Sequence, residues 1–107
     1  MTAPTLPVLD QAQLARRTMG DPQTQAEMLA LFVAEVERLM RQVEDTSDPQ
    51  VRGERLRALA IAARNLGAVR LCAAARAAET EIGGTLDLAA LRAAVTETLA
   101  QLTSQSS

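Results

Sequence analysis

Residues 21–45 have the sequence DPQTQAEMLALFVAEVERLMRQVED, and this stretch decides the fold class. Asp21 and Pro22 supply a helix N-cap followed by proline at the first helical position. Apolar side chains then recur at spacings of three and four residues, the period of one helix face. They are Met28, Leu29, Phe32, Val33, Val36, Leu39, Met40 and Val43. The stretch therefore predicts one long amphipathic helix over residues 22–45.

Similar signals on both sides of this stretch predict four more helices. Asp48 followed by proline repeats the start signal, and Gly67 is suited to a left-handed helix end. These two positions bound a helix over about 49–65. Asp10 as N-cap and Gly20 as the stop bound a short helix before the long one. The remaining helices are expected over about 68–82 and 86–102, with a break near Gly84.

The element pattern predicts an all-α protein. Four long helices joined by short loops pack as an antiparallel up-down four-helix bundle, and the short first helix would cover one end. With one aromatic residue, Phe32, the core must consist of Leu, Val, Met and Ala. We expect an N-terminal arm over residues 1–8, a single helical domain over 9–102 and a polar C-terminal tail over 103–107.

The composition excludes several kinds of chemistry. All 11 basic residues are Arg, and the chain has neither Lys nor His. A Ser-His or Cys-His nucleophile pair, an imidazole base and a Lys Schiff base are therefore excluded. Cys72 is the single Cys, so no intrachain disulfide forms and a Cys/His zinc site is excluded. We expect no metal, no cofactor and no enzymatic activity.

Charge and hydropathy bear on the partners. The formal net charge of −2 provides no basic excess for a nucleic-acid backbone, so a nucleic-acid partner is not expected. The N-terminus lacks the features of a secretion signal, and no apolar run is long enough to cross a bilayer. These features favour a soluble cytoplasmic protein that does not act at a membrane.

Several motifs occur in an order that resembles the histidine phosphotransfer (HPt) domain family. Leu9-Asp10, Gly20-Asp21 and the segment MLALF (residues 28–32) resemble the family's opening, "LD…GD…ELLxLF". The segment RNLGAVRL (residues 64–71), followed by Glu79, resembles the stretch after the family's active-site motif. The similarity covers roughly residues 9–102. It implies a helical bundle that takes part in bacterial two-component phosphorelays.

The active-site motif of that family, A-H-x-L-K-G-x-A-x-x-[LI]-G-A, aligns without a gap on residues 56–68. Leu59 and Ala63 match the motif. Arg57 stands in place of the phosphorylated His, Ala60 in place of the Lys and Ile61 in place of the Gly. A guanidinium stays protonated at any working pH, so Arg57 cannot act as the nucleophile. The resemblance therefore implies a degenerate member that kept the scaffold and lost the phosphorylation site.

The same residues form a pattern on the predicted helix over 49–65. At about 100° per residue, Arg57, Ala60, Ile61 and Arg64 fall on one side of the helix, and Leu59, Ala62, Ala63 and Leu66 on the other. Arg57, Ile61 and Arg64 are expected to form an outward stripe, cationic at both ends and apolar in the middle. One interpretation is a docking stripe for a partner, and the other is a solvated face with one stray Ile.

We expect Glu37 of the preceding helix to lie beside this stripe and to pair with Arg57. The leading hypothesis is a non-phosphorylatable pseudo-HPt domain, a monomer or weak homo-oligomer, that binds a response-regulator receiver domain or a histidine kinase. The alternative is a structural or assembly module that uses the same bundle for self-association or for an unrelated partner. Cys72, which lies among Ala and Leu, is expected to be a buried, inert thiol.

Overall fold

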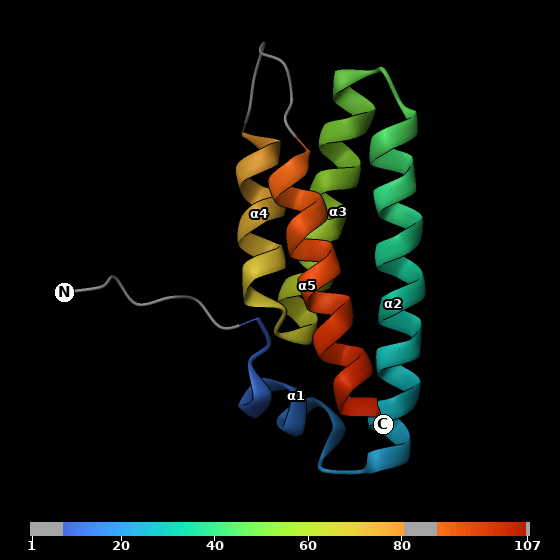
Figure 1. Cartoon of the computed structure of the whole chain (residues 1–107), viewed down its shortest axis with the longest axis vertical. Coiled ribbons are helices and arrows are strands. Elements are labelled where there is room, and N and C mark those ends of the chain that lie inside the picture. The colour runs from blue at the N-terminus through green and yellow to red at the C-terminus, as the bar shows by residue number, and fades with distance from the viewer. Residues whose placement is uncertain (1–7, 81–87, 107) are drawn as a thin grey trace, which may run out of the picture.

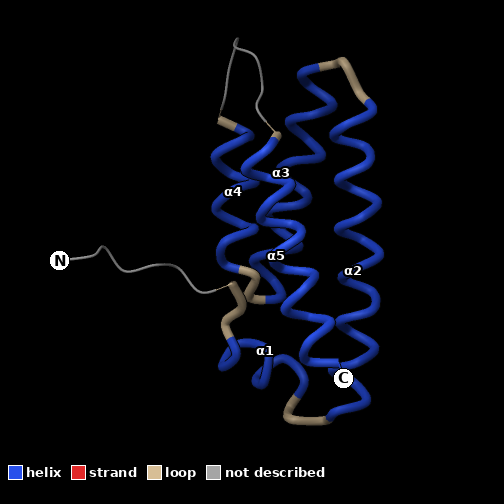
Figure 2. Tube along the Cα trace, viewed as in Figure 1, coloured by secondary structure: helices blue, strands red, loops and turns tan. Residues whose placement is uncertain are grey.

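The computed structural model describes residues 8–80 and 88–106, and these residues form five helices and no strand (Figures 1 and 2). The helices are α1 (Gln11–Thr18), α2 (Pro22–Asp45), α3 (Pro49–Leu66), α4 (Val69–Glu79) and α5 (Ala89–Ser106). The predicted all-α class is confirmed for this part of the chain. None of these helices is long and apolar enough to cross a membrane.

The first three helices begin where the sequence predicts. Asp10, Asp21 and Asp48 are the N-caps of α1, α2 and α3, and each carboxylate accepts a hydrogen bond from a backbone N–H of the first turn. The hydroxyl of Thr24 and the backbone N–H of Gln23 both donate to Asp21, and these bonds lower the pKa of its carboxyl. Local side-chain chemistry is therefore sufficient to set these helix starts.

Two helix ends differ from expectation. Met19, not Gly20, caps α1, and its φ of 54° is in the left-handed region. The side chain of Met19 is 92% exposed, so its unbranched chain avoids crowding at this turn. The second difference is that α5 continues through Ser106, whereas the prediction ended it at 102. The expected break near Gly84, the last residues of the helix predicted over 68–82 and the start of the one over 86–102 lie outside the described residues.

The helices bury one continuous apolar cluster. In Figure 1, α2, α3, α4 and α5 lie side by side along the long axis, and α1 lies across one end. The contact between α3 and α4 is the most extensive, and both helices bury small side chains: Ala60 and Ala63 on α3, Ala75 and Ala78 on α4. Phe32 is the one aromatic residue of the core, which otherwise contains Leu, Val, Met and Ala as predicted.

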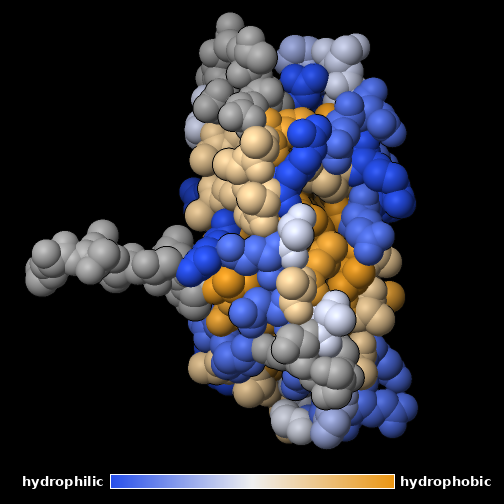
Figure 3. All heavy atoms as spheres, viewed as in Figure 1, coloured by the Kyte–Doolittle hydropathy of each residue, from blue (hydrophilic) through white to orange (hydrophobic). Residues whose placement is uncertain are grey.

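The contact between α2 and α5 is the least extensive among the neighbouring long helices. In Figure 3, apolar surface is visible between these two helices. A pocket of about 180 Å³ opens along this contact, lined by Ala26, Leu29, Ala30, Val33, Leu102 and Thr103. The most extensive helix contact of the described residues is thus the one between α3 and α4.

The turn between α3 and α4 is joined to the start of α1. Gly67 ends α3 with a φ of 93°, and its carbonyl accepts a hydrogen bond of 2.7 Å from the backbone N–H of Asp10. A Cβ at position 67 would lie 3.2 Å from both the Cβ and the carbonyl oxygen of Asp10. Gln13 donates from Nε2 to the carbonyl oxygens of Arg64 (2.7 Å) and Asn65 (3.2 Å). Glycine is therefore favoured here both by backbone conformation and by space.

Gly67→Ala is expected to destabilise the protein by at least about 1–2 kcal/mol, the usual cost of a left-handed residue with a Cβ, with the Asp10 contact adding to it. Gly53→Ala is the matched control. Gly53 lies inside α3, and a Cβ there would have no atom within 4 Å. That substitution should stabilise by about 0.5–1 kcal/mol. Urea denaturation of both variants measures the difference, and equal stabilities would contradict the role given to Gly67.

Candidate functional site

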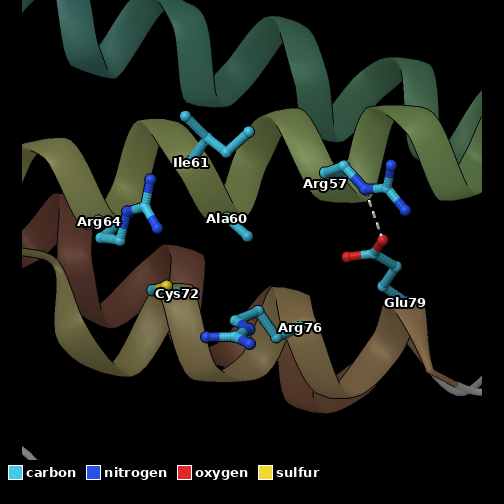
Figure 4. A pocket seen from close by; sticks show the side chains of 7 residues that line it. All are labelled: Arg57, Ala60, Ile61, Arg64, Cys72, Arg76 and Glu79. Atoms are coloured by element: carbon cyan, nitrogen blue, oxygen red, sulfur yellow. Dashed lines mark hydrogen bonds and ion pairs between the residues drawn. The ribbon is translucent and has the colours of Figure 1, made fainter.

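A pocket of about 290 Å³ opens between α3 and α4 (Figure 4). We call it the α3–α4 groove. Its lining comes from α3 (Arg57, Ala60, Ile61 and Arg64) and from α4 (Cys72, Arg76 and Glu79). The four α3 residues that the sequence analysis named therefore all line the α3–α4 groove. Glu37, the fifth, is exposed on α2 and is not part of the lining.

The outward stripe is present, with one correction. Arg57 and Arg64 are exposed, and Ile61 is 45% exposed, as predicted. Exposure of a large apolar side chain at this level is unusual, since Ile is among the most frequently buried residues. Ala60 was expected on the outward side but is only 6% exposed, because α4 packs against this part of α3. Ala60 therefore lies within the groove and not on the outward stripe.

The predicted pair between Glu37 and Arg57 is wrong. Arg57 donates from Nε to Oε1 of Glu79 on α4, at 2.9 Å. The side chain of Glu79 is 23% exposed and that of Arg57 is 72% exposed. The rotation of α3 turns Arg57 toward α4 and away from α2. Figure 4 shows this pair at one end of the groove.

The other two arginines of the groove differ from Arg57. Within residues 8–80 and 88–106, the side chains of Arg64 and Arg76 form no hydrogen bond and no ion pair. In Figure 4, Arg76 extends back along α4 toward Cys72, and the guanidinium of Arg64 lies on the facing side of the groove. This end of the groove thus carries two guanidinium groups, each a planar cationic group with several N–H donors.

Sequence reasoning missed the contribution of α4. Cys72 was expected to be buried, but it is half-buried and lines the groove. Arg76 was not singled out at all. The spacing of Cys72, Arg76 and Glu79, four and then three residues, places them on one helix face and could have identified them together. The spacing does not show which helix packs against that face, because this depends on how α4 packs in the bundle.

The groove continues toward α1. A second pocket, of about 250 Å³, shares three of the lining residues and reaches the α3–α4 turn. Its lining comprises Gln13, Arg64, Gly67, Val69, Cys72, Ala73 and Arg76. Among the described residues, no group of three or more His, Cys, Asp or Glu side chains could hold a metal ion. The arrangement is chemically suited to contact apolar surface at Ile61 and to bind anionic groups at the arginines.

No protein-family model, no curated protein and no solved structure matches this chain.

A double-mutant cycle tests the partner of Arg57. Arg57→Ala and Glu79→Ala should show a coupling of about 0–1 kcal/mol, the range for exposed ion pairs, and the coupling should decrease with added salt. The cycle of Arg57→Ala with Glu37→Ala should show none. Thermal or urea unfolding of the single and double variants measures both couplings. A coupling in the Glu37 cycle that exceeds the Glu79 cycle would contradict the observed pairing.

Proposed function

We propose that this chain is a non-catalytic HPt-like module of two-component signalling that binds a receiver domain or a histidine kinase without accepting a phosphoryl group. Support comes from the ordered motifs that resemble the HPt family and from the all-helical architecture. The finer arrangement, an antiparallel up-down four-helix bundle with a short extra helix, is part of this proposal. It is supported by the contacts of α3 with α2 and α4 and of α5 with α4 and α2.

The exposed Ile61 is the observation that carries the proposal. It lies on the outward stripe between Arg57 and Arg64, on the helix where the HPt family has its reactive His. An apolar side chain bordered by charged ones is typical of the centre of a protein–protein contact, because its burial stabilises the complex and the charges orient the partner. Receiver domains are the partners of the family that this chain resembles, and they carry an acidic phosphorylation pocket that complements the arginines of such a stripe.

The substitution at position 57 defines the proposed mode of action. Arg57 offers no unprotonated nitrogen for phosphoryl transfer, and it is held by Glu79. A receiver domain bound at the outward stripe would therefore keep its phosphoryl group while its docking surface is covered. The module would act as a competitor or adaptor for the other partners of that receiver.

Incubation with a phosphorylated receiver domain should transfer no acid-labile phosphate to this chain. Arg57→His alone is expected to be insufficient to restore transfer, because Ile61 crowds the site and Ala60 adds no positive charge. The measurement is radiolabel transfer followed by gel separation, with an active HPt domain as the positive control. Labelling of the unmodified chain would overturn the non-catalytic assignment.

Ile61→Asp tests the docking stripe. It should leave the melting temperature nearly unchanged, since the side chain is already exposed, and should weaken partner binding about thirtyfold, or roughly 2 kcal/mol. Leu31→Asp is the matched control, because Leu31 is a 73% exposed apolar residue on α2 outside the groove. The partners are purified receiver domains and kinase modules encoded in the same genome, titrated by calorimetry.

Three outcomes separate the hypotheses. Loss of binding in Ile61→Asp but not in Leu31→Asp supports the docking stripe. Retained binding in both variants shows that the partner contacts another surface. If the chain self-associates in size-exclusion chromatography and Ile61→Asp makes it monomeric, the stripe is an assembly surface and the signalling proposal is wrong.

A further inference from the structure

Positive charge is concentrated in the α3–α4 groove. The whole chain has a formal net charge of −2, yet the groove lining carries three arginines and one glutamate, a net charge of +2. Because Arg57 and Glu79 neutralise each other through their ion pair, the excess belongs to Arg64 and Arg76. Those two side chains come from different helices and form no hydrogen bond or ion pair within the described residues.

The groove places these two arginines around one hollow. Ala60 is only 6% exposed and Cys72 is half-buried, so short side chains form the surface between the two exposed guanidinium groups and leave room there for an anion. Arg64 and Arg76 also line the neighbouring pocket, so an anion between them would be reachable from both ends of the groove.

The size and charge of the site indicate the ligand class. A volume of about 290 Å³ lies at the lower end of small-molecule pockets, which begin near 300 Å³, so one compact group fits better than a large ligand. Two planar guanidinium groups each present a pair of N–H donors that matches phosphate oxygens. A group with two negative charges would balance both. We propose that the α3–α4 groove binds a phosphate-type dianion, free or as a monoester, between Arg64 and Arg76.

This inference does not rest on the proposed function, and its test uses the isolated chain. The experiment is a titration of the ¹⁵N-labelled protein with inorganic phosphate, at constant ionic strength, followed by NMR. We expect saturable shifts at the backbone amide of Cys72 and at the side-chain Nε of Arg64 and Arg76. An interaction with two exposed guanidinium groups should give a Kd of about 1 mM.

Three variants test the residues. Arg64→Gln and Arg76→Gln should each raise the Kd about tenfold or more. Glu79→Gln should lower it roughly two- to fivefold, because it removes a negative charge and releases Arg57 into the groove. Arg38→Gln is the matched control, since Arg38 lies on α2 in an exposed pair with Glu35 and removes the same charge from outside the groove. That variant should bind as the native chain does.

A second titration, with methyl phosphate, distinguishes free phosphate from a phosphate monoester as the ligand. Binding of both compounds supports a site open to monoesters, and binding of inorganic phosphate alone supports a site for the free ion. Acetate, with one charge, should bind at least tenfold more weakly. Equal shifts with acetate, no saturation, or the same affinity in Arg76→Gln and Arg38→Gln would overturn the proposal. Circular dichroism melts of each variant verify folding, and Arg76→Gln carries the test should Arg64→Gln be unstable.

Discussion

The close contact of α3 with α4 is the constraint on which the rest of the structure depends. Gly67 makes the turn that reverses the chain between these helices, and its lack of a side chain lets Asp10 approach its backbone. Small buried residues such as Ala60 and Ala75 then let the helices approach closely. The position of α1 follows from the same turn, because Asp10 donates its N–H to Gly67. A larger residue at 67 would disturb both the helix pair and the end that α1 covers.

The contact between α3 and α4, with its small buried residues, also determines which charged side chains lie close together. Short side chains between α3 and α4 leave the longer residues at the edge of the contact to face one another. Arg57 reaches Glu79 across this edge, and Arg64 faces the side of α4 that carries Arg76. The ion pair contributes little to stability because Arg57 is largely exposed. Its main effect is to pair the charge of one arginine, so that the unpaired positive charge of the groove lies at its other end.

Local signals were sufficient for the starts of α1, α2 and α3, and tertiary contacts decided the site. The Asp-Pro pairs at Asp21 and Asp48 define helix starts because capping needs only neighbouring residues. The exposure of Ile61 followed from helix periodicity alone. The burial of Ala60 and the pairing of Arg57 with Glu79 could not be predicted, since both depend on how α4 rotates against α3. The predicted pair of Arg57 with Glu37 was wrong because the prediction placed Arg57 opposite α2, the helix that precedes α3 in the chain. In the structure Arg57 faces α4 instead.

Arg64 belongs to both the outward stripe and the groove, and this shared position links the two proposals. An anion bound in the groove would engage the guanidinium that a docked partner needs beside Ile61. A partner carrying only carboxylates would therefore compete with phosphate, and thermodynamic linkage requires the effect to be equal in both directions. A partner that itself carries a phosphoryl group would place it between Arg64 and Arg76, and it too would compete with free phosphate. The two kinds of partner are therefore distinguished by comparing the phosphorylated and unphosphorylated forms of the partner, because only a module that recognises the phosphorylated form gains affinity from the phosphoryl group.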